Sequence, residues 1–454
     1  MIRVHHSVAA RHRMAGLSLV EMMVALVMAL IVAAGIITVF TSTSSSNKVQ
    51  SQMAVLQEEG RFAIQSLRTD LANANGGYCS NSGGNASGTA SGLYLDALRS
   101  PTVYAETMAT VDAAFHDNTT SIAGDSPTGA YSLPSFLYMR GYDCTATTCT
   151  PVDPHTDVSA IPAMGKAVGD RVPGAAVLTI RYLKPDSGWT ISPNGGTPGS
   201  IINAGADGTV TSITLKPITA QGEPTTFSGS LAMLADCSNA QVFQVAVAGN
   251  TITPDTTAGA NYASPIDISK GAAPRLFDFS TDFQTVTYYL EVVCADGTTP
   301  CDHTTGELVR RVNGVDQPMV RGVERLDFGY GIINSDGNTQ ILTANEVDTG
   351  TDASGNSIAC PPDVSTPAGM PTTGCLWRAV QTIQVSLLMD GQTPLYTLSN
   401  AEMGYIYSLD GANGGTTPAA PSVHPIQPDV DQGFPKQLIR REFTTLVALR
   451  NFNP

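Results

Sequence analysis

The sequence predicts an α+β fold, in which one long amino-terminal helix precedes a β-rich, disulfide-bonded globular domain with long loops. An apolar run that ends at Phe40 continues into an amphipathic pattern, as expected for a helix that leaves a membrane and packs on a domain. Short runs rich in Val, Ile, Thr and Tyr follow, and this composition is typical of strands. All eight cysteines lie after the apolar run, which favours disulfides in an exported domain.

The first 40 residues divide into a leader and a membrane-spanning segment. Residues 1–16 contain arginines and no acidic residue, whereas the run from Leu17 to Phe40 contains Glu21 as its only ionisable group. A helix of this length spans ~36 Å, which exceeds the ~30 Å hydrocarbon core of a bilayer. The arginines predict a cytoplasmic amino terminus and a translocated remainder. A cleaved secretory signal ending near Ala33-Ala34-Gly35 is the alternative, but such signals have apolar cores of only ~7–15 residues.

Residues 41–75 are predicted to form the amphipathic half of the same helix, after a polar hinge at Thr41–Asn47. Apolar residues recur there every three or four positions, which is the period of one helix face. The stripe comprises Met53, Leu56, Gly60, Ala63, Ile64, Leu67, Leu71 and Ala74. The polar residues expected on the other faces are Arg61, Gln65, Arg68 and Asp70. The tandem glycines after Asn75 are expected to end the helix, and residues 76–454 form the β-rich domain.

Nine runs in the carboxyl-terminal domain alternate or are rich in β-branched residues and are predicted to be strands. They are Phe136–Arg140, Ala176–Leu183, Thr209–Leu215, Val242–Val247, Val286–Val293, Leu308–Val312, Arg325–Tyr330, Val380–Leu388 and Phe443–Arg450. Long segments rich in Gly, Pro and Thr separate them, and we expect these segments to be functional or mobile loops. The longest are 184–208, 249–275, 333–378 and 408–436. A division into two sheets or subdomains near residues 250–280 is an alternative.

Charge and motifs exclude several classes of function. The net charge of −15 argues against nucleic-acid binding, because the domain would repel phosphates. The domain histidines lie in no nucleophile, zinc-protease or phosphate-loop motif, so we expect neither catalysis nor a cofactor. These histidines are His116, His155, His303 and His424. Three Asp/Asn groups could offer oxygen ligands to Ca²⁺ but are expected to form Asx-type turns. They are Asp336 to Asn338, Asp352 with Asn356, and Asp410 with Asn413.

The cysteines are expected to pair with their nearest neighbours in sequence, because short loops close most often. This rule predicts the pairs Cys144–Cys149, Cys294–Cys301 and Cys360–Cys375, and it leaves Cys79–Cys237 as a long-range link. A metal site that uses Cys294, Cys301 and His303 is the alternative. Their spacing differs from that of zinc fingers and ribbons, so we expect no metal.

The hexapeptide Gly16-Leu17-Ser18-Leu19-Val20-Glu21 resembles the prepilin cleavage motif of type IV pilins and type II secretion pseudopilins. The resemblance implies that a membrane aspartyl peptidase cuts after Gly16 and that the new amino terminus, Leu17, is N-methylated. Glu21 then corresponds to the glutamate at position five of the mature chain. A carboxylate inside a bilayer costs roughly 2.5–3.5 kcal/mol, so it persists best with a partner, and the Leu17 amine is available. A start at Met14 would leave the cut unchanged.

Further stretches resemble PilW-like minor pilins and imply a type IV pilin-like fold. They are Pro173 to Tyr182, Asp236-Cys237 with Val242 to Val245, Tyr288 to Leu290, Glu307 to Arg311, Met319 to Tyr330, Val380 to Leu388 and Arg440 to Asn451. The family implies an initiating or tip complex with other minor and major pilins, together with the prepilin peptidase, the inner-membrane assembly machinery and membrane lipid. Cell adhesion and twitching motility are the associated processes.

The resemblance implies an inner-membrane protein with a single span and a periplasmic domain, which later joins a pilus at the cell surface. Two alternatives remain open at this point. One is a J-type minor pseudopilin of a type II secretion system, which carries the same motif. The other is a membrane-tethered adhesin or binding protein whose anchor stays uncut.

Overall fold

A computed structural model provides the structure of the chain. It describes residues 18–76, 78, 86–89, 92–95, 101–105, 130–132, 137–157, 161–193, 198–236, 240–257, 263–271, 273–298, 300–333, 339–358, 374–413 and 417–449. The chain divides into two compact units, one that ends at Ala54 and one that begins at Val55.

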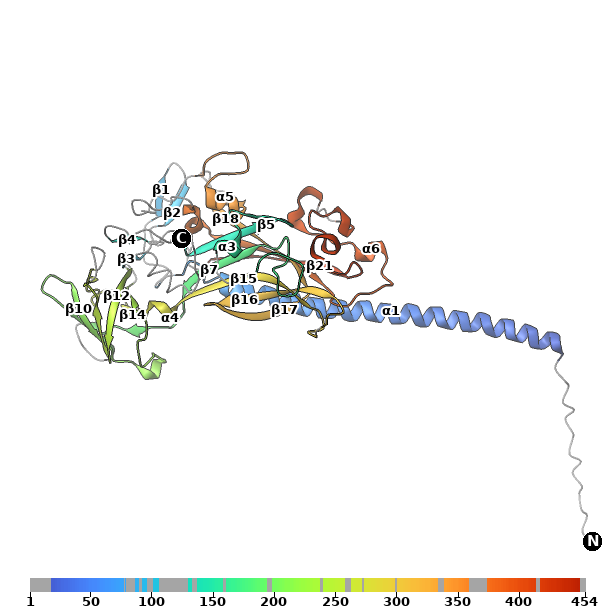
Figure 1. Ribbon diagram of the computed structural model, residues 1–454, viewed down its shortest axis with the longest axis horizontal. Coiled ribbons are helices and arrows are strands. Elements are labelled where there is room, and N and C mark those ends of the chain that lie inside the picture. The colour runs from blue at the N-terminus through green and yellow to red at the C-terminus, as the bar shows by residue number, and fades with distance from the viewer. Residues whose placement is uncertain are drawn as a thin grey trace, which may run out of the picture. The chain divides into compact units, whose positions relative to one another are not determined.

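Helix α1 runs without a break from Leu19 to Leu71 and therefore belongs to both units (Figure 1). The hinge expected at Thr41–Asn47 is wrong, because this polar segment is helical throughout. The Thr41 hydroxyl donates to Ile37 O at 2.9 Å, and such bonds to the preceding turn let threonines remain inside a helix. The helix ends shortly before the tandem glycines, and Asn75 adopts a left-handed φ of 60° at the exit.

The strands of the described residues form four sheets, and the docked part of α1 contacts residues of the six-stranded and four-stranded ones. The six-stranded sheet has the order β17-β16-β15-β7-β5-β6 and is antiparallel. Its strands are β5 (Met139–Cys144), β6 (Cys149–Thr150), β7 (Val177–Leu183), β15 (Phe283–Cys294), β16 (Thr304–Val312) and β17 (Val315–Arg321). The four-stranded sheet has the order β19-β18-β20-β21. Its strands are β18 (Val323–Ile333), β19 (Thr339–Leu342), β20 (Thr382–Asp390) and β21 (Arg440–Ala448).

The other two sheets lie earlier in the chain. A nine-stranded sheet follows the path β8-β14-β11-β12-β13-β10-β9, and β3 adds to β12 in parallel and to β4. Its strands are β3 (Thr102–Tyr104), β4 (Tyr131–Ser132), β8 (Trp189–Thr190), β9 (Ile201–Ala204), β10 (Val210–Thr214), β11 (Leu231–Ala235), β12 (Ala240–Ala248), β13 (Thr251–Pro254) and β14 (Arg275–Asp278). The hairpin β1 (Ala86–Thr89) and β2 (Gly92–Leu95) is the fourth sheet. In Figure 1, β10, β12 and β14 lie at the opposite end of the β domain from α6 (Asn400–Met403).

Short helices connect the strands. They are α3 (Pro154–Asp157), α4 (Phe279–Asp282), α5 (Ala344–Thr349) and α6 (Asn400–Met403), with 3₁₀ or π turns at Thr219–Gln221, Cys375–Ala379, Ser408–Asn413, Pro421–Val423 and Pro428–Gln432. The predicted α+β class is confirmed. Each of the nine predicted strands overlaps an observed one, but segments expected to be long loops also contain strands, such as β9 and β13.

One large core joins the helix to the sheets. It contains Leu56, Leu67 and Leu71 of α1 together with Leu178 of β7 and Val385 of β20, and all five side chains are fully buried. A smaller core of the nine-stranded sheet is built around Trp189, Phe227 and Phe243. The division suspected near residues 250–280 corresponds to a change of sheet, because β14 ends the nine-stranded sheet at Asp278 and β15 of the six-stranded sheet begins at Phe283. It does not separate compact units, because the chain from Val55 onward forms a single unit.

Candidate functional site

The amino-terminal half of α1 is apolar on all sides and uncovered. Leu19 is 76% exposed and Phe40 is 72% exposed, and every residue between them is exposed as well. This segment is long and apolar enough to cross a membrane, and none of it is buried within the structure. A helix that is hydrophobic all round requires lipid or partner helices as its surroundings. It is therefore a candidate surface for membrane anchoring and for packing against other helices.

Glu21 closes the first turn of this helix through a capping box. The Ser18 N–H donates to Glu21 Oε2 at 2.9 Å, and the Glu21 N–H donates to Ser18 Oγ at 3.2 Å. These bonds satisfy two backbone donors that a helix start leaves without partners, which matters most where water is excluded. The sequence signal is Ser-x-x-Glu, and we did not predict the cap from it. Gly16 and Leu17, the predicted cleavage and methylation residues, lie outside the described residues.

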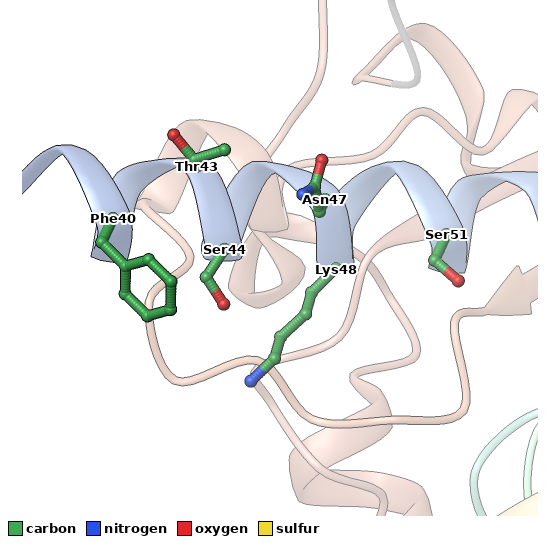
Figure 2. A pocket seen from close by; sticks show the side chains of 6 residues that line it. All are labelled: Phe40, Thr43, Ser44, Asn47, Lys48 and Ser51. Carbon is green, nitrogen blue, oxygen red and sulfur yellow. The ribbon is translucent and has the colours of Figure 1, made fainter.

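A polar band follows the apolar segment along α1. Figure 2 shows Phe40, Ser44 and Lys48 on one side of the helix, at intervals of four residues. Lys48 is the first basic residue after the apolar run, and Thr43, Asn47 and Ser51 complete the lining of a shallow recess here. The change from Phe40 to this band marks where an apolar environment would give way to water.

The carboxyl-terminal half of α1 packs on the β domain with the face that the sequence predicts. The buried members of the stripe are Leu56, Gly60, Ala63, Leu67, Leu71 and Ala74, whereas Met53 and Ile64 are half-buried. Gly60 has a steric reason for its identity. A Cβ atom placed there would lie 2.5 Å from Cζ of Phe443 on β21, so the absent side chain admits this ring. The predicted amphipathic stripe is thus confirmed.

Asp70 is the exception, because we expected it on a solvent-facing side and it is buried. Its carboxylate accepts hydrogen bonds from the Tyr182 hydroxyl at 3.1 Å and the Tyr288 hydroxyl at 2.6 Å. Arg310 Nε donates to Asp70 Oδ2 at 2.5 Å and forms an ion pair with it. The register places Tyr288 of β15 directly opposite Arg310 of β16, which brings both donors to one carboxylate.

The electrostatics of this anchor follow from burial. Burial and the Asp70 carboxylate raise the pKa of both tyrosines, so each remains a neutral donor at physiological pH. A buried carboxylate is tolerated when a cation and hydrogen bonds compensate it, and Asp70 has one cation and two hydroxyl donors. The last two turns of α1 are therefore fixed to three strands of the six-stranded sheet through a single side chain.

A second polar contact holds the preceding part of the docked helix. Gln392 Nε2 donates to Glu59 Oε2 at 2.6 Å and to Arg321 O at 3.2 Å. Burial raises the pKa of Glu59 above its usual value. At the exit of the helix, the Asn75 side-chain amide donates to Trp377 O at 3.2 Å. Side chains far away in sequence therefore fasten α1 at several points.

The two disulfides of the described residues are those predicted from proximity. Cys144 is joined to Cys149, and Cys294 is joined to Cys301. The second disulfide consumes both thiols of the alternative metal site, whose third member, His303, makes a 2.9 Å hydrogen bond through Nε2 to Gln392 O. The pairs Cys360–Cys375 and Cys79–Cys237 involve residues outside the described part of the chain.

The remaining candidate residues have structural partners. The Asp352 carboxylate accepts from the Asn356 N–H at 2.8 Å, which is the expected turn. Asp410 contacts Arg325 and lies 2.5 Å from His424 Nδ1, so its carboxylate is occupied by side chains of the chain itself. His155 Nδ1 lies 2.5 Å from the carbonyl of residue 161. His116 and the segment 336–338 lie outside the described residues.

A buried ion pair joins the edge of the four-stranded sheet to its interior. Arg440 of β21 contacts both carboxylate oxygens of Glu324 on β18, at 2.6 and 2.9 Å, and both side chains are fully buried. Arg440 also donates to Pro435 O at 2.8 Å. Such bidentate geometry fixes orientation as well as charge, so it sets the position of β21 and hence of the Phe443 ring.

Comparison with known proteins identifies one segment of the chain. Residues 297–451 match the sequence model of a family described as PilW, type IV pilus-assembly protein W. This segment is about one third of the chain and contains β16 to β21. No curated protein and no solved structure matches the chain. The match supports a PilW-like family for this segment and a role related to type IV pili.

Proposed function

We propose that the chain is a minor pilin that helps initiate assembly of a type IV pilus or occupies its tip, without catalysis. The observation that carries the proposal is the continuity of α1. An uncovered apolar helix continues directly into a segment that is docked on a domain with a PilW-like carboxyl-terminal third. A helix of this kind can reside in a membrane and later pack against the helices of other subunits in place of lipid, because both surroundings are apolar.

In the proposed mechanism, a prepilin peptidase cuts after Gly16 and leaves a methylated amine on Leu17. The Glu21 carboxylate pairs with the amine of its own chain or of a neighbouring subunit and so fixes the axial register of the packed helices. The β domain faces outward, where it meets other minor pilins. The acidic domain has no expected role with nucleic acid, and no cofactor is needed.

The first test is the intact mass of the protein extracted from membranes. We expect a chain that starts at N-methylated Leu17. A chain that starts at Met1 would instead support a tethered adhesin, and one that starts at Gly35 would support an ordinary signal peptide; either would refute the pilin proposal. Two host mutants then distinguish a minor pilin from a J-type pseudopilin. Assembly of a minor pilin should fail in the mutant that lacks the pilus machinery, whereas assembly of a J-type pseudopilin should fail in the mutant that lacks the secretion machinery.

The second test separates the two roles available to Glu21. Glu21→Gln retains an acceptor for the Ser18 N–H, because Gln also closes a capping box, but it removes the charge. Ser18→Ala removes the hydroxyl cap and retains the charge. We expect normal cleavage in both variants, and loss of the protein from sheared pili only with Glu21→Gln. Equal incorporation of both variants would contradict the register role.

A further inference from the structure

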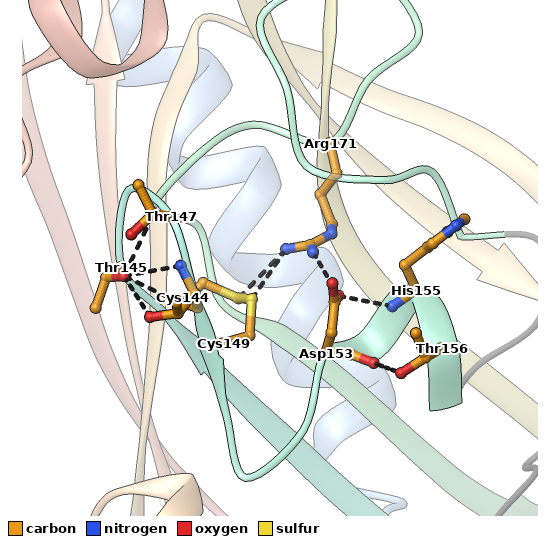
Figure 3. The surroundings of a disulfide bond; sticks show 9 residues. Cys144, Thr145, Thr147, Cys149, Asp153, His155, Thr156 and Arg171 are labelled. Carbon is orange, nitrogen blue, oxygen red and sulfur yellow. Dashed lines mark hydrogen bonds and ion pairs between the residues drawn. A yellow bond between two sulfur atoms is a disulfide. The ribbon is translucent and has the colours of Figure 1, made fainter.

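The disulfide between Cys144 and Cys149 lies against a buried cation. Arg171 is fully buried, and its Nη1 lies 3.3 Å from Cys144 Sγ and 3.6 Å from Cys149 Sγ. Figure 3 shows the guanidinium between the two sulfurs and Asp153. The backbone of Arg171 is fixed by a bridge to Glu291 of β15, and its guanidinium has a second partner in Asp153, so two contacts besides the disulfide hold this residue.

The charge of Arg171 is incompletely compensated. Among the residues that the structure describes, its one ion pair is to Asp153 Oδ1 at 3.2 Å, and the side chain of Asp153 is 50% exposed. The same oxygen also accepts from the His155 N–H at 3.0 Å. Within the described residues, Arg171 Nε is buried and makes no hydrogen bond. A buried guanidinium is stabilised by close anions, whereas the two side-chain atoms that Nη1 contacts are neutral sulfurs.

Reduction of the disulfide would supply the missing anion. A thiolate formed at Cys144 would lie against Nη1, and an adjacent arginine lowers the pKa of a thiol from its ordinary value of about 8.5. A thiol with a low pKa is also the better leaving group in disulfide exchange. Arginine therefore favours the reduced state and the reaction that forms it.

We propose that Cys144–Cys149 is a thiol–disulfide exchange site whose co-reactant is a dithiol, either a small molecule or a dithiol protein, and that Arg171 holds the Cys144 thiolate. A thiolate of the dithiol attacks Cys149 Sγ, a bond forms between these sulfurs, and the Cys144–Cys149 bond breaks with its electron pair left on Cys144. The second thiol of the dithiol then attacks the mixed disulfide and releases Cys149 as a thiol. The dithiol is oxidised to a disulfide, the protein is reduced by two electrons, and one proton goes to solvent while Cys144 remains a thiolate.

The surrounding loop permits this reaction. Thr145, Thr147 and Thr148, which lie between the two cysteines, are exposed, so a reagent can approach from the loop side. The Thr145 N–H donates to Thr148 O at 2.8 Å, and the Thr148 N–H donates to Thr145 Oγ1 at 3.0 Å. These bonds do not depend on the disulfide, so the turn can keep both sulfurs near Arg171 after the bond opens.

The second disulfide is an internal control. In the described part of the chain, no side-chain donor contacts the sulfur atoms of Cys294 or Cys301 in the way that Arg171 contacts the first pair. Both disulfides close short loops, with sequence separations of 5 and 7 residues. Their difference in reducibility should therefore report the guanidinium more than the loop length.

The experiment is a redox titration of the full chain in detergent with dithiothreitol, followed by alkylation and peptide mass analysis of each cysteine. In buffers of reduced and oxidised dithiothreitol, we expect Cys144–Cys149 to be half-reduced at a ratio of reduced to oxidised dithiothreitol roughly tenfold lower in the wild type than in Arg171→Met, a factor equal to ~30 mV for two electrons. Asp153→Asn should shift the midpoint of Cys144–Cys149 in the direction opposite to Arg171→Met, because this substitution removes the carboxylate that competes with the thiolate for Arg171. The midpoint of Cys294–Cys301 should stay unchanged in both variants.

Asp153→Asn keeps the test decisive even when Arg171→Met does not fold, since Asp153 is half-exposed. A monothiol trap provides the second measurement, with the adduct expected on Cys149 rather than Cys144. Equal midpoints in all three proteins, a shift of both variants in one direction, or an adduct shared equally by the two cysteines would overturn the proposal. Any of these results would leave the pilin proposal untouched, because that proposal depends on processing and incorporation.

Discussion

Replacement of Asp70 by asparagine keeps the size of the side chain and removes the charge that anchors the end of α1. The Asp70 carboxylate receives Arg310 and the hydroxyls of Tyr182 and Tyr288. An asparagine side chain offers only one acceptor oxygen and turns two donor hydrogens toward these groups. At least one of the three partners therefore loses its hydrogen bond.

The expected loss is about 3 kcal/mol of unfolding free energy. Removal of one partner of a buried ion pair costs roughly 3–5 kcal/mol, and an unpaired buried hydroxyl costs roughly 1–3 kcal/mol. Two features reduce this sum. The Arg310 side chain is 22% exposed and can recruit water, and the asparagine oxygen can still accept from Tyr288. An estimate near the low end of the ion-pair range follows.

Urea denaturation of the full chain in detergent measures the loss. Both tryptophans of the sequence, Trp189 and Trp377, are buried in the β domain, so their fluorescence reports its unfolding. Hydrogen exchange should show lost protection over residues 56–71 first. Glu58→Gln is the matched control, since it removes one negative charge from an exposed position of the same helix. Equal midpoints for Asp70→Asn and Glu58→Gln would refute the anchoring role of Asp70.

Three further predictions concern packing, pH and capping. Gly60→Val should lower stability by about 1–3 kcal/mol through its clash with Phe443, and Phe443→Ala should partly rescue it in a double-mutant cycle. Burial raises the pKa of the Asp282 carboxyl from 3.8 to about 6, so the folded protein binds a proton there more tightly than the unfolded chain does. The stability that this bound proton contributes is therefore lost as pH rises from about 4 to 6. Asp282→Asn should therefore match the wild type at pH 4 and exceed it in melting temperature at pH 7; a deficit at pH 7 would contradict this sign. Thr343→Ala removes the hydroxyl of the capping box with Glu346 and should cost about 1 kcal/mol, whereas an unchanged urea midpoint would argue against the cap.

The sequence predicts the elements whose local pattern and final environment agree. The stripe from Leu56 to Ala74 was recognisable because a docked helix repeats its apolar positions every three or four residues. Strands such as β7 and β15 were recognisable because their β-branched and aromatic residues pack well in sheets. The fold class follows from these two patterns alone.

The missed elements are those decided by distant partners. Strand β11 (Leu231–Ala235) consists of residues that favour helices, yet its pairing with β12 and β14 makes it a central strand. Strand β17 is an edge strand with an internal Pro318, which weakens its local signal. Asp70 looked like a surface residue because its partner Arg310 is 240 residues away in sequence. Only the register of β15 and β16 brings the partners together.

The residues that α1 contacts through named side chains lie largely in the segment that resembles PilW. Four positions of the helix or its exit contact residues of 297–451: Glu59 with Gln392, Gly60 with Phe443, Asp70 with Arg310, and Asn75 with Trp377. All strands of the nine-stranded sheet precede this segment, since the last of them ends at Asp278. The resemblance therefore covers much of what holds the helix, although Tyr182 and Tyr288, which also donate to Asp70, precede it. The nine-stranded sheet lies wholly outside the resemblance, yet its residues Leu231 and Phe277 belong to the same core as Leu67 of α1. Features particular to this chain should therefore be sought at positions of this sheet that do not enter that shared core.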